Sequence, residues 1–113
     1  MQKGSVNKVI LVGHLGSDPE SRFTPGGTAV ATFSIATNES RKNSEGNWED
    51  HTEWHRCVLF GKQAETAAEY VKKGQMVYVE GRLQTRSWED KEGMKRYSTE
   101  VVGNAFTMLG RRN

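Results

Sequence analysis

The chain has 113 residues, which is enough for one domain and too few for two ordinary ones. Hydrophobic residues make up 35% of it and the mean hydropathy is −0.75, so the expected core is modest and oligomerisation would add to its stability. A net charge of +2 excludes recognition of nucleic acid by overall charge alone. The lone cysteine, Cys57, excludes an internal disulfide. The sequence has no run of about 18 apolar residues, so no transmembrane helix is predicted.

The first half of the chain predicts two strands separated by turns. Residues 6–15 are rich in β-formers and end between two glycines, and residues 28–37 alternate between apolar and polar side chains. Turns are predicted at residues 18–19 and 24–27, where proline and glycine occur. Residues 38–50 are polar and charged, and predict a long flexible hairpin loop with room for short strands at its base.

The second half predicts three strands and one helix. Residues 53–60 form the third strand, and residues 62–73 have the apolar spacing of a helix with Lys72 and Lys73 in its last turn and Gly74 as its C-cap. The last two strands are then predicted at residues 76–88 and 97–109. A charged hairpin tip at residues 89–96 joins them.

The predicted order is β-β-β-α-β-β, which is an all-β class with one helix. One helix between the third and fourth of five strands is typical of the OB-fold, a partly open five-stranded barrel whose face binds oligonucleotides or oligosaccharides. We therefore expect one OB-fold domain over residues 1–110.

The third strand carries the pattern that bears most directly on function. Cys57 and Leu59 suit a core, so the alternate positions face outward, and these are Trp54, Arg56, Val58 and Phe60. The reverse orientation would place the two aromatic residues in the core, but it would also bury the arginine between them at a high desolvation cost.

The fourth strand repeats this pattern. If Val77, Val79 and Leu83 face inward, the residues that face outward are Tyr78, Arg82, Arg86 and Trp88. Exposed aromatic rings between arginines suit stacking of nucleic-acid bases, with the guanidinium groups on the phosphates. Every base has a π-face, so the predicted activity is binding of single-stranded nucleic acid without sequence preference.

Several short motifs also resemble one known family. Residues 6–13 (VNKVILVG), 18–20 (DPE), 52–56 (TEWHR), 60–62 (FGK) and 78–81 (YVEG) have the order and spacing found in bacterial-type single-stranded DNA-binding proteins. The resemblance implies an OB-fold that assembles as a homotetramer and protects single-stranded DNA in replication, recombination and repair. It also implies a cytoplasmic, nucleoid-associated protein in a bacterium.

The resemblance assigns roles to individual residues by position. Stacking aromatics match Trp54, Phe60 and Trp88; basic positions on the DNA path match Arg22, Arg56, Lys62, Lys73 and Arg86; and His55 matches a subunit-interface position. Many relatives have a tryptophan where this chain has Arg41, and Trp48 follows further along the same segment. Arg41 and Trp48 therefore complete the candidate DNA-binding set, with the role of Trp48 as a stacking platform left open.

The end of the chain departs from the family pattern. The family continues into a flexible linker and an acidic tip that recruits replication and repair enzymes, whereas residues 110–113 read Gly-Arg-Arg-Asn. We expect residues 111–113 to be the start of a truncated or absent tail. Protein partners of that kind are expected only if the full-length protein carries the acidic tip.

The residues give less support to an enzymatic function. His14, His51 and His55 lie in two loops and a strand without zinc spacing, so no metal site and no cofactor are expected. No nucleophile motif or phosphate-binding loop occurs. An OB-fold nuclease would need a carboxylate cluster near the groove, and a replication-restart accessory protein of the same fold would act mainly through protein partners.

Overall fold

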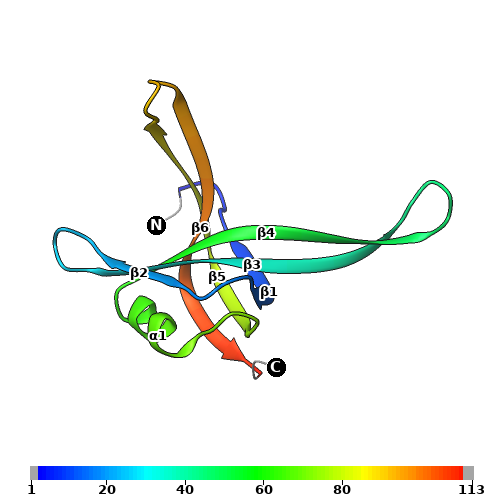
Figure 1. Cartoon of the computed structure of the whole chain (residues 1–113), viewed down its shortest axis with the longest axis horizontal. Helices are drawn as coiled ribbons and strands as arrows, with labels where there is room; N and C mark the ends of the chain where they lie inside the picture. The colour runs from blue at the N-terminus through cyan, green and yellow to red at the C-terminus, as the bar shows by residue number, and fades with distance from the viewer. Residues whose placement is uncertain (1–2, 111–113) are drawn as a thin grey trace.

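The computed structural model describes residues 3–110 (Figure 1), and the expected start of a tail at residues 111–113 lies outside this range. The described part of the chain consists of strands and one helix. In chain order the elements are β1 (Val9–Leu15), β2 (Glu20–Phe23), β3 (Ala29–Lys42), β4 (Trp48–Phe60), α1 (Lys62–Tyr70), β5 (Met76–Glu89) and β6 (Lys95–Leu109).

The strands form one sheet that closes on itself. Their order is β1-β5-β6-β4-β3-β2, and β1 also pairs with β3, where Leu15 lies opposite Ile35. This pairing makes a barrel of five strands, with β2 added at the edge beside β3. Strand pairs are antiparallel except β4 and β6, which run parallel where Cys57 lies opposite Val101. The predicted OB-fold, with its helix between β4 and β5, is confirmed.

Strand β2 was not predicted, because the only signals in this part of the sequence are the turns on either side of it, at residues 18–19 and 24–27. Its side chains are all exposed, so it has no alternation of apolar and polar residues to mark it as a strand. It exists because it pairs with β3 over four residue pairs, from Glu20 opposite Thr32 to Phe23 opposite Ala29.

The predicted loop at residues 38–50 is wrong for most of its length. β3 continues to Lys42 and β4 begins at Trp48, so only residues 43–47 form the turn. The Asn43 side-chain oxygen accepts the backbone N–H groups of Glu45 and Asn47, both at 2.9 Å, and closes this turn. The paired strands form a polar ribbon that is exposed on both faces and projects from the barrel (Figure 1).

Helix α1 is shorter than predicted. Val71 leaves the helical conformation with ψ of 134° and its side chain is fully buried, because packing in the core overrides the helical pattern. Lys72 and Lys73 therefore lie beyond the last turn, and Gly74 is not the C-cap. Gly74 instead adopts a positive φ of 87° and donates its N–H to the carbonyl of Leu15 at 2.8 Å.

The core lies inside the barrel and under α1. Its largest fully buried side chains are Ile35, Leu59, Val30, Val71, Val77, Val79 and Cys57. Burial raises the pKa of the Cys57 thiol to about 12, so this thiol stays protonated at neutral pH. No helix within residues 3–110 is long and apolar enough to cross a membrane.

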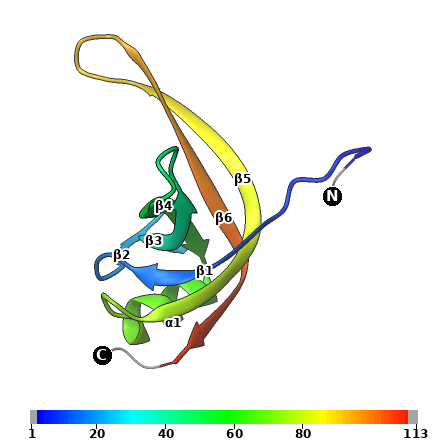
Figure 2. The same ribbon diagram turned by 90° about the vertical axis from the view of Figure 1, so that its right-hand side faces the viewer.

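The second long hairpin, β5–β6, also leaves the barrel. Figure 2 shows that the two strands curve away together toward their shared tip. Asp90 organises this tip: one carboxylate oxygen accepts the N–H groups of Glu92 and Met94, both at 2.9 Å, and the other accepts Nε of Arg96 at 2.9 Å. The Arg96 bond and then the Met94 N–H hold the pKa of the Asp90 carboxyl below its ordinary value of 3.8.

This network predicts that acid loosens the β5–β6 tip. A carboxyl whose pKa is lowered by folding stabilises the folded tip above its unfolded pKa, and the stabilisation is lost as pH falls through the lowered value. Amide exchange measured by NMR should show falling protection of the Glu92 and Met94 N–H groups as the pH is lowered from 6 to 2. In Asp90→Ala, which removes both acceptor oxygens, their protection should be low already at pH 6. Protection that stays constant over this range in the unaltered protein would contradict the role of Asp90.

Candidate nucleic-acid interface

The outward face of β4 carries the predicted aromatic and cationic side chains. Trp54 is 59% exposed and Phe60 is 47% exposed, with Arg56 exposed between them, whereas Cys57 and Leu59 are fully buried. The predicted orientation of the strand is therefore correct. Val58 also belongs to the outward set, but it is only 6% exposed, because neighbouring side chains on this face cover it.

Strand β5 follows the prediction inside the barrel and departs from it outside. Val77 and Val79 are fully buried, but Leu83 is 48% exposed, so its predicted inward position is wrong. β5 leaves the barrel after Gly81, and every side chain from residue 82 to 89 is exposed. Arg86 and Trp88 lie on the face of β5 that continues the outward face of β4.

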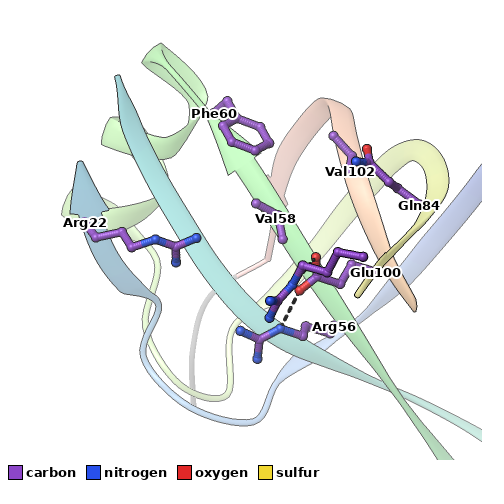
Figure 3. Close-up of a pocket in the computed structure, with 8 residues that line it drawn as sticks. Arg22, Arg56, Val58, Phe60, Gln84, Glu100 and Val102 are labelled. Atoms are coloured by element: carbon purple, nitrogen blue, oxygen red, sulfur yellow. Dashed lines mark hydrogen bonds and ion pairs between the residues drawn. The ribbon is translucent and has the colours of Figure 1, made fainter. Parts of the chain in front are cut away.

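A cavity of about 410 Å³ lies at the centre of this combined face (Figure 3). Side chains from β2, β4, β5 and β6 line it, and they include both apolar and charged groups. The lining residues are Arg22, Arg56, Val58, Phe60, Gln84, Arg86, Glu100 and Val102. We call this surface, together with Trp54 and Trp88, the aromatic–arginine face.

One acidic residue lies within this cationic surface. Glu100, on β6, is only 8% exposed. One of its oxygens lies 2.8 Å from Nε of Arg56 and the other lies 3.2 Å from Nε of Arg86. The Arg86 guanidinium in turn lies 4.8 Å from the centre of the Trp88 ring, so these four residues form a continuous chain of contacts. Sequence reasoning missed Glu100, because nothing local marks it as the partner of arginines on two other strands.

Trp54 owes its position to a glycine. A Cβ atom on Gly16 would lie 2.5 Å from Cζ3 of Trp54, so only glycine leaves room for the ring to lie against this backbone. Gly16 is held in place by its N–H bond to the carbonyl of Ser34 on β3, at 3.1 Å. The end of β1 thus forms a platform under the Trp54 ring.

The remaining basic candidates differ in whether they line the cavity. Arg22 lines the cavity and donates to the Thr32 hydroxyl at 3.3 Å. Lys62 is exposed at the start of α1, two residues after Phe60. Lys73 does not line the cavity, and its backbone N–H donates to Asp18 at 2.7 Å.

The two candidates on the β3–β4 hairpin are separated by the ribbon itself. Trp48 is 69% exposed with the Lys42 ammonium 6.0 Å from its ring, and strand parity places it on the same side of β4 as Trp54. Arg41 lies on the other side and pairs with Glu39 at 2.8 Å. The structure therefore brings Trp48, but not Arg41, onto the side of the ribbon that carries Trp54.

His55, the expected subunit-interface residue, is half-buried within its own chain. Its Nε2 atom lies 2.8 Å from the hydroxyl oxygen of Thr37 on the neighbouring strand β3. Among the described residues, no group of three or more histidine, cysteine, aspartate or glutamate side chains is arranged to hold a metal ion.

Comparison with known proteins places this geometry in a family. Residues 6–109 match the profile of the Single-strand binding protein family. Over 109 residues the chain is 53% identical to "Single-stranded DNA-binding protein 1" of Chlorobaculum tepidum, which covers 96% of this chain and 67% of that protein.

Two solved structures share the fold. The "Plasmodium falciparum SSB complex with ssDNA" superimposes with a TM-score of 0.88 at 33% identity and covers 97% of this chain and 100% of the other. A deletion mutant of the single-stranded DNA binding protein from Thermus aquaticus gives a TM-score of 0.82 at 34% identity, covering 93% of this chain and about half (51%) of the other. The profile match and the 53% identity agree with the barrel and its aromatic–arginine face: this chain belongs to the single-strand binding protein family.

Proposed function

We propose that this protein binds single-stranded DNA without sequence preference on the aromatic–arginine face. The observation that carries the proposal is the exposure of Trp54, Phe60 and Trp88 beside Arg56 and Arg86 on one continuous surface. Exposed aromatic rings lose contact with water when bases stack on them, and guanidinium groups pair with the phosphates between those bases. The ligand named for the Plasmodium relative, ssDNA, supports this assignment.

The proposed mechanism is passive binding, in which no covalent bond is made or broken. Bases stack on the three aromatic residues, while the phosphates contact Arg22, Arg56, Lys62 and Arg86, with Lys73 and Trp48 reached by a strand that continues past the cavity. The cavity carries one carboxylate, Glu100, and each of its oxygens already forms an ion pair with an arginine. This pairing favours a binding surface over a nuclease, which would use free carboxylates to hold metal ions.

The biological role that we propose is the covering and protection of exposed single strands during replication, recombination and repair. The Chlorobaculum relative, which is named as a single-stranded DNA-binding protein, supports this role. The location that we propose is the bacterial cytoplasm, with the nucleoid. Residues 1–110 are proposed as the DNA-binding domain. Recruitment of replication and repair enzymes is proposed only for a full-length protein with an acidic tail.

We also propose that four copies assemble into a homotetramer. The outward side chains of β1 support it: Ile10 is 56% exposed and Val12 is 48% exposed, with Tyr78 opposite Val12 on β5. Exposed apolar side chains gathered on a strand face suit contact with another copy. The Tyr78 hydroxyl donates to Glu80 at 2.8 Å, and this bond, followed by the Lys8 ammonium, lowers the pKa of the Glu80 carboxyl and keeps it charged beside the apolar residues.

Titration with poly(dT) tests binding and assembly together. Stacking should quench the tryptophan fluorescence strongly, and the quenching should saturate at a fixed number of nucleotides per tetramer. Sedimentation in the same buffer measures the oligomeric state. Duplex DNA of equal length should give little quenching. A protein that sediments as a monomer would contradict the tetramer, and unquenched fluorescence at saturating poly(dT) would contradict stacking.

The same titration at several salt concentrations tests the phosphate contacts. Each contact releases counterions, and for single strands log K falls with log[salt] with a slope of about −0.7 per phosphate. Four contacts per subunit, from Arg22, Arg56, Lys62 and Arg86, therefore predict a slope of about −3 per subunit. Affinity that does not change with salt would show that stacking alone holds the strand.

A further inference from the structure

The position of Glu100 needs a physical reason, because it places a buried negative charge on a surface proposed to bind a polyanion. Its side chain is only 10% exposed. It contacts the Arg56 side chain, which is 44% exposed (Figure 3), and the Arg86 side chain, which is 50% exposed. A carboxylate there repels phosphate and reduces the net charge of the three-residue group from +2 to +1. An apolar residue would avoid that repulsion, so the carboxylate must contribute something else.

The geometry of the two ion pairs indicates what that contribution is. Each oxygen of Glu100 contacts the Nε atom of a different arginine, at 2.8 Å for Arg56 and 3.2 Å for Arg86. In each pair the guanidinium atom that contacts the carboxylate is Nε, and both arginine side chains remain about half exposed. A guanidinium held at Nε can still present its terminal nitrogens to a phosphate.

We propose that Glu100 is a positioning residue for single-stranded DNA binding. It holds Arg56 and Arg86 in the orientation that meets the phosphates, and through Arg86, whose guanidinium lies 4.8 Å from the Trp88 ring centre, it orients one stacking platform as well. Holding two long side chains before binding removes the ordering cost that each free arginine would carry on contact with the strand. The inference rests on the proposed function, since it concerns how the same face binds.

The proposal and simple electrostatics predict opposite signs for Glu100→Gln. Removing a negative charge should strengthen DNA binding if charge alone matters. A glutamine of the same size can accept from one arginine through its oxygen, but its NH₂ group is a donor and cannot accept from the second. Loss of positioning should therefore weaken binding of oligo(dT) by roughly threefold to tenfold, despite the more positive charge.

Glu89→Gln is the charge-matched control. Glu89 is exposed on the same strand as Arg86, and strand parity places it on the opposite side of the hairpin. Its replacement changes the net charge by the same amount without touching the arginines. We expect its affinity for oligo(dT) to equal or slightly exceed that of the unaltered protein.

A second background separates positioning from a general effect on the fold. In a protein that carries Arg56→Ala and Arg86→Ala, Glu100 has no arginine to hold, so Glu100→Gln should leave the affinity unchanged or raise it. Dissociation constants are measured by fluorescence anisotropy, with circular dichroism to confirm that each variant is folded. An equal loss of affinity in both backgrounds would overturn the proposal, because a purely structural residue acts in that way. An affinity of Glu100→Gln that equals or exceeds that of the unaltered protein would also overturn it.

A third variant decides the matter if Glu100→Gln fails to fold. Arg86→Lys keeps the positive charge at an exposed position but lacks the Nε atom that Glu100 holds. It should weaken binding by a similar factor, and affinity equal to that of the unaltered protein would overturn the proposal. If the unaltered protein itself does not bind oligo(dT), the proposed function fails, which is a different result from either of these.

Discussion

Replacement of Trp54 or Trp88 by alanine is expected to weaken binding of single-stranded DNA by about 1–3 kcal/mol each, which is roughly fivefold to 150-fold in the dissociation constant. Each ring is exposed, at 59% for Trp54 and 42% for Trp88, so each offers its surface to a base. Neither ring belongs to the buried core cluster, so both variants should still fold, which circular dichroism can confirm.

Tyr97→Ala is the matched control for this experiment. Tyr97 is 66% exposed, and it lies opposite Ser87 on the β5–β6 hairpin, so its ring is on the other side from Trp88. Its removal should leave the affinity for labelled oligo(dT) within about twofold of the unaltered protein, well below the effect of a lost stacking platform. Unchanged affinity in both tryptophan variants would contradict the proposed stacking, and an equal loss in Tyr97→Ala would place the DNA on both sides of the hairpin.

Replacement of Gly81 by alanine is expected to have the largest effect on stability. A Cβ atom there would lie 2.0 Å from the backbone oxygen of Val102 and 2.7 Å from its carbonyl carbon. Backbone atoms of a paired strand cannot rotate away as a side chain would, and the β5–β6 register already shifts between Glu80 and Gly81. We expect a loss of about 3 kcal/mol in the free energy of unfolding, or roughly 10 °C or more in the unfolding midpoint.

Gly26→Ala provides the comparison for Gly81→Ala. A Cβ atom on Gly26 would meet only the Thr24 hydroxyl oxygen, at 3.9 Å, and Gly26 is not among the described glycines with positive φ. Alanine there should be neutral or slightly stabilising, because it restricts the unfolded chain. Calorimetry on the two variants measures the difference. A midpoint for Gly81→Ala that equals that of Gly26→Ala would show that β5 and β6 can separate at this point without cost.

The parts of the fold that could be predicted from the sequence are those in which one face of a strand is buried. Cys57 and Leu59 on β4, and Val77 and Val79 on β5, occupy every second position, and that period places them on the face opposite to their neighbours. The outward position of Trp54 and Phe60 followed from the same alternation. The barrel and the outward side chains of β4 could therefore be predicted from the sequence.

The parts that could not be predicted depend on contacts between distant residues. The outer half of the β3–β4 hairpin is exposed on both sides, and cross-strand pairs such as Ser40 with Asp50 hold it, at 2.8 Å, which only the register reveals. Glu100 is separated in sequence from Arg56 by 44 residues, so its burial between two arginines has no local signal. The early end of α1 likewise depends on where Val71 finds space in the core.

The two projecting hairpins have a consequence for how such a protein can change over evolutionary time. Each hairpin ends in a short turn outside the barrel, closed by Asn43 in one case and by Asp90 in the other. Adding one pair of opposed residues next to either turn would lengthen the ribbon by about 3.4 Å without touching the core or the strand pairing behind it. The length of either ribbon can thus change while the barrel stays the same, so selection can act separately on how far the hairpins extend and on the stability of the barrel.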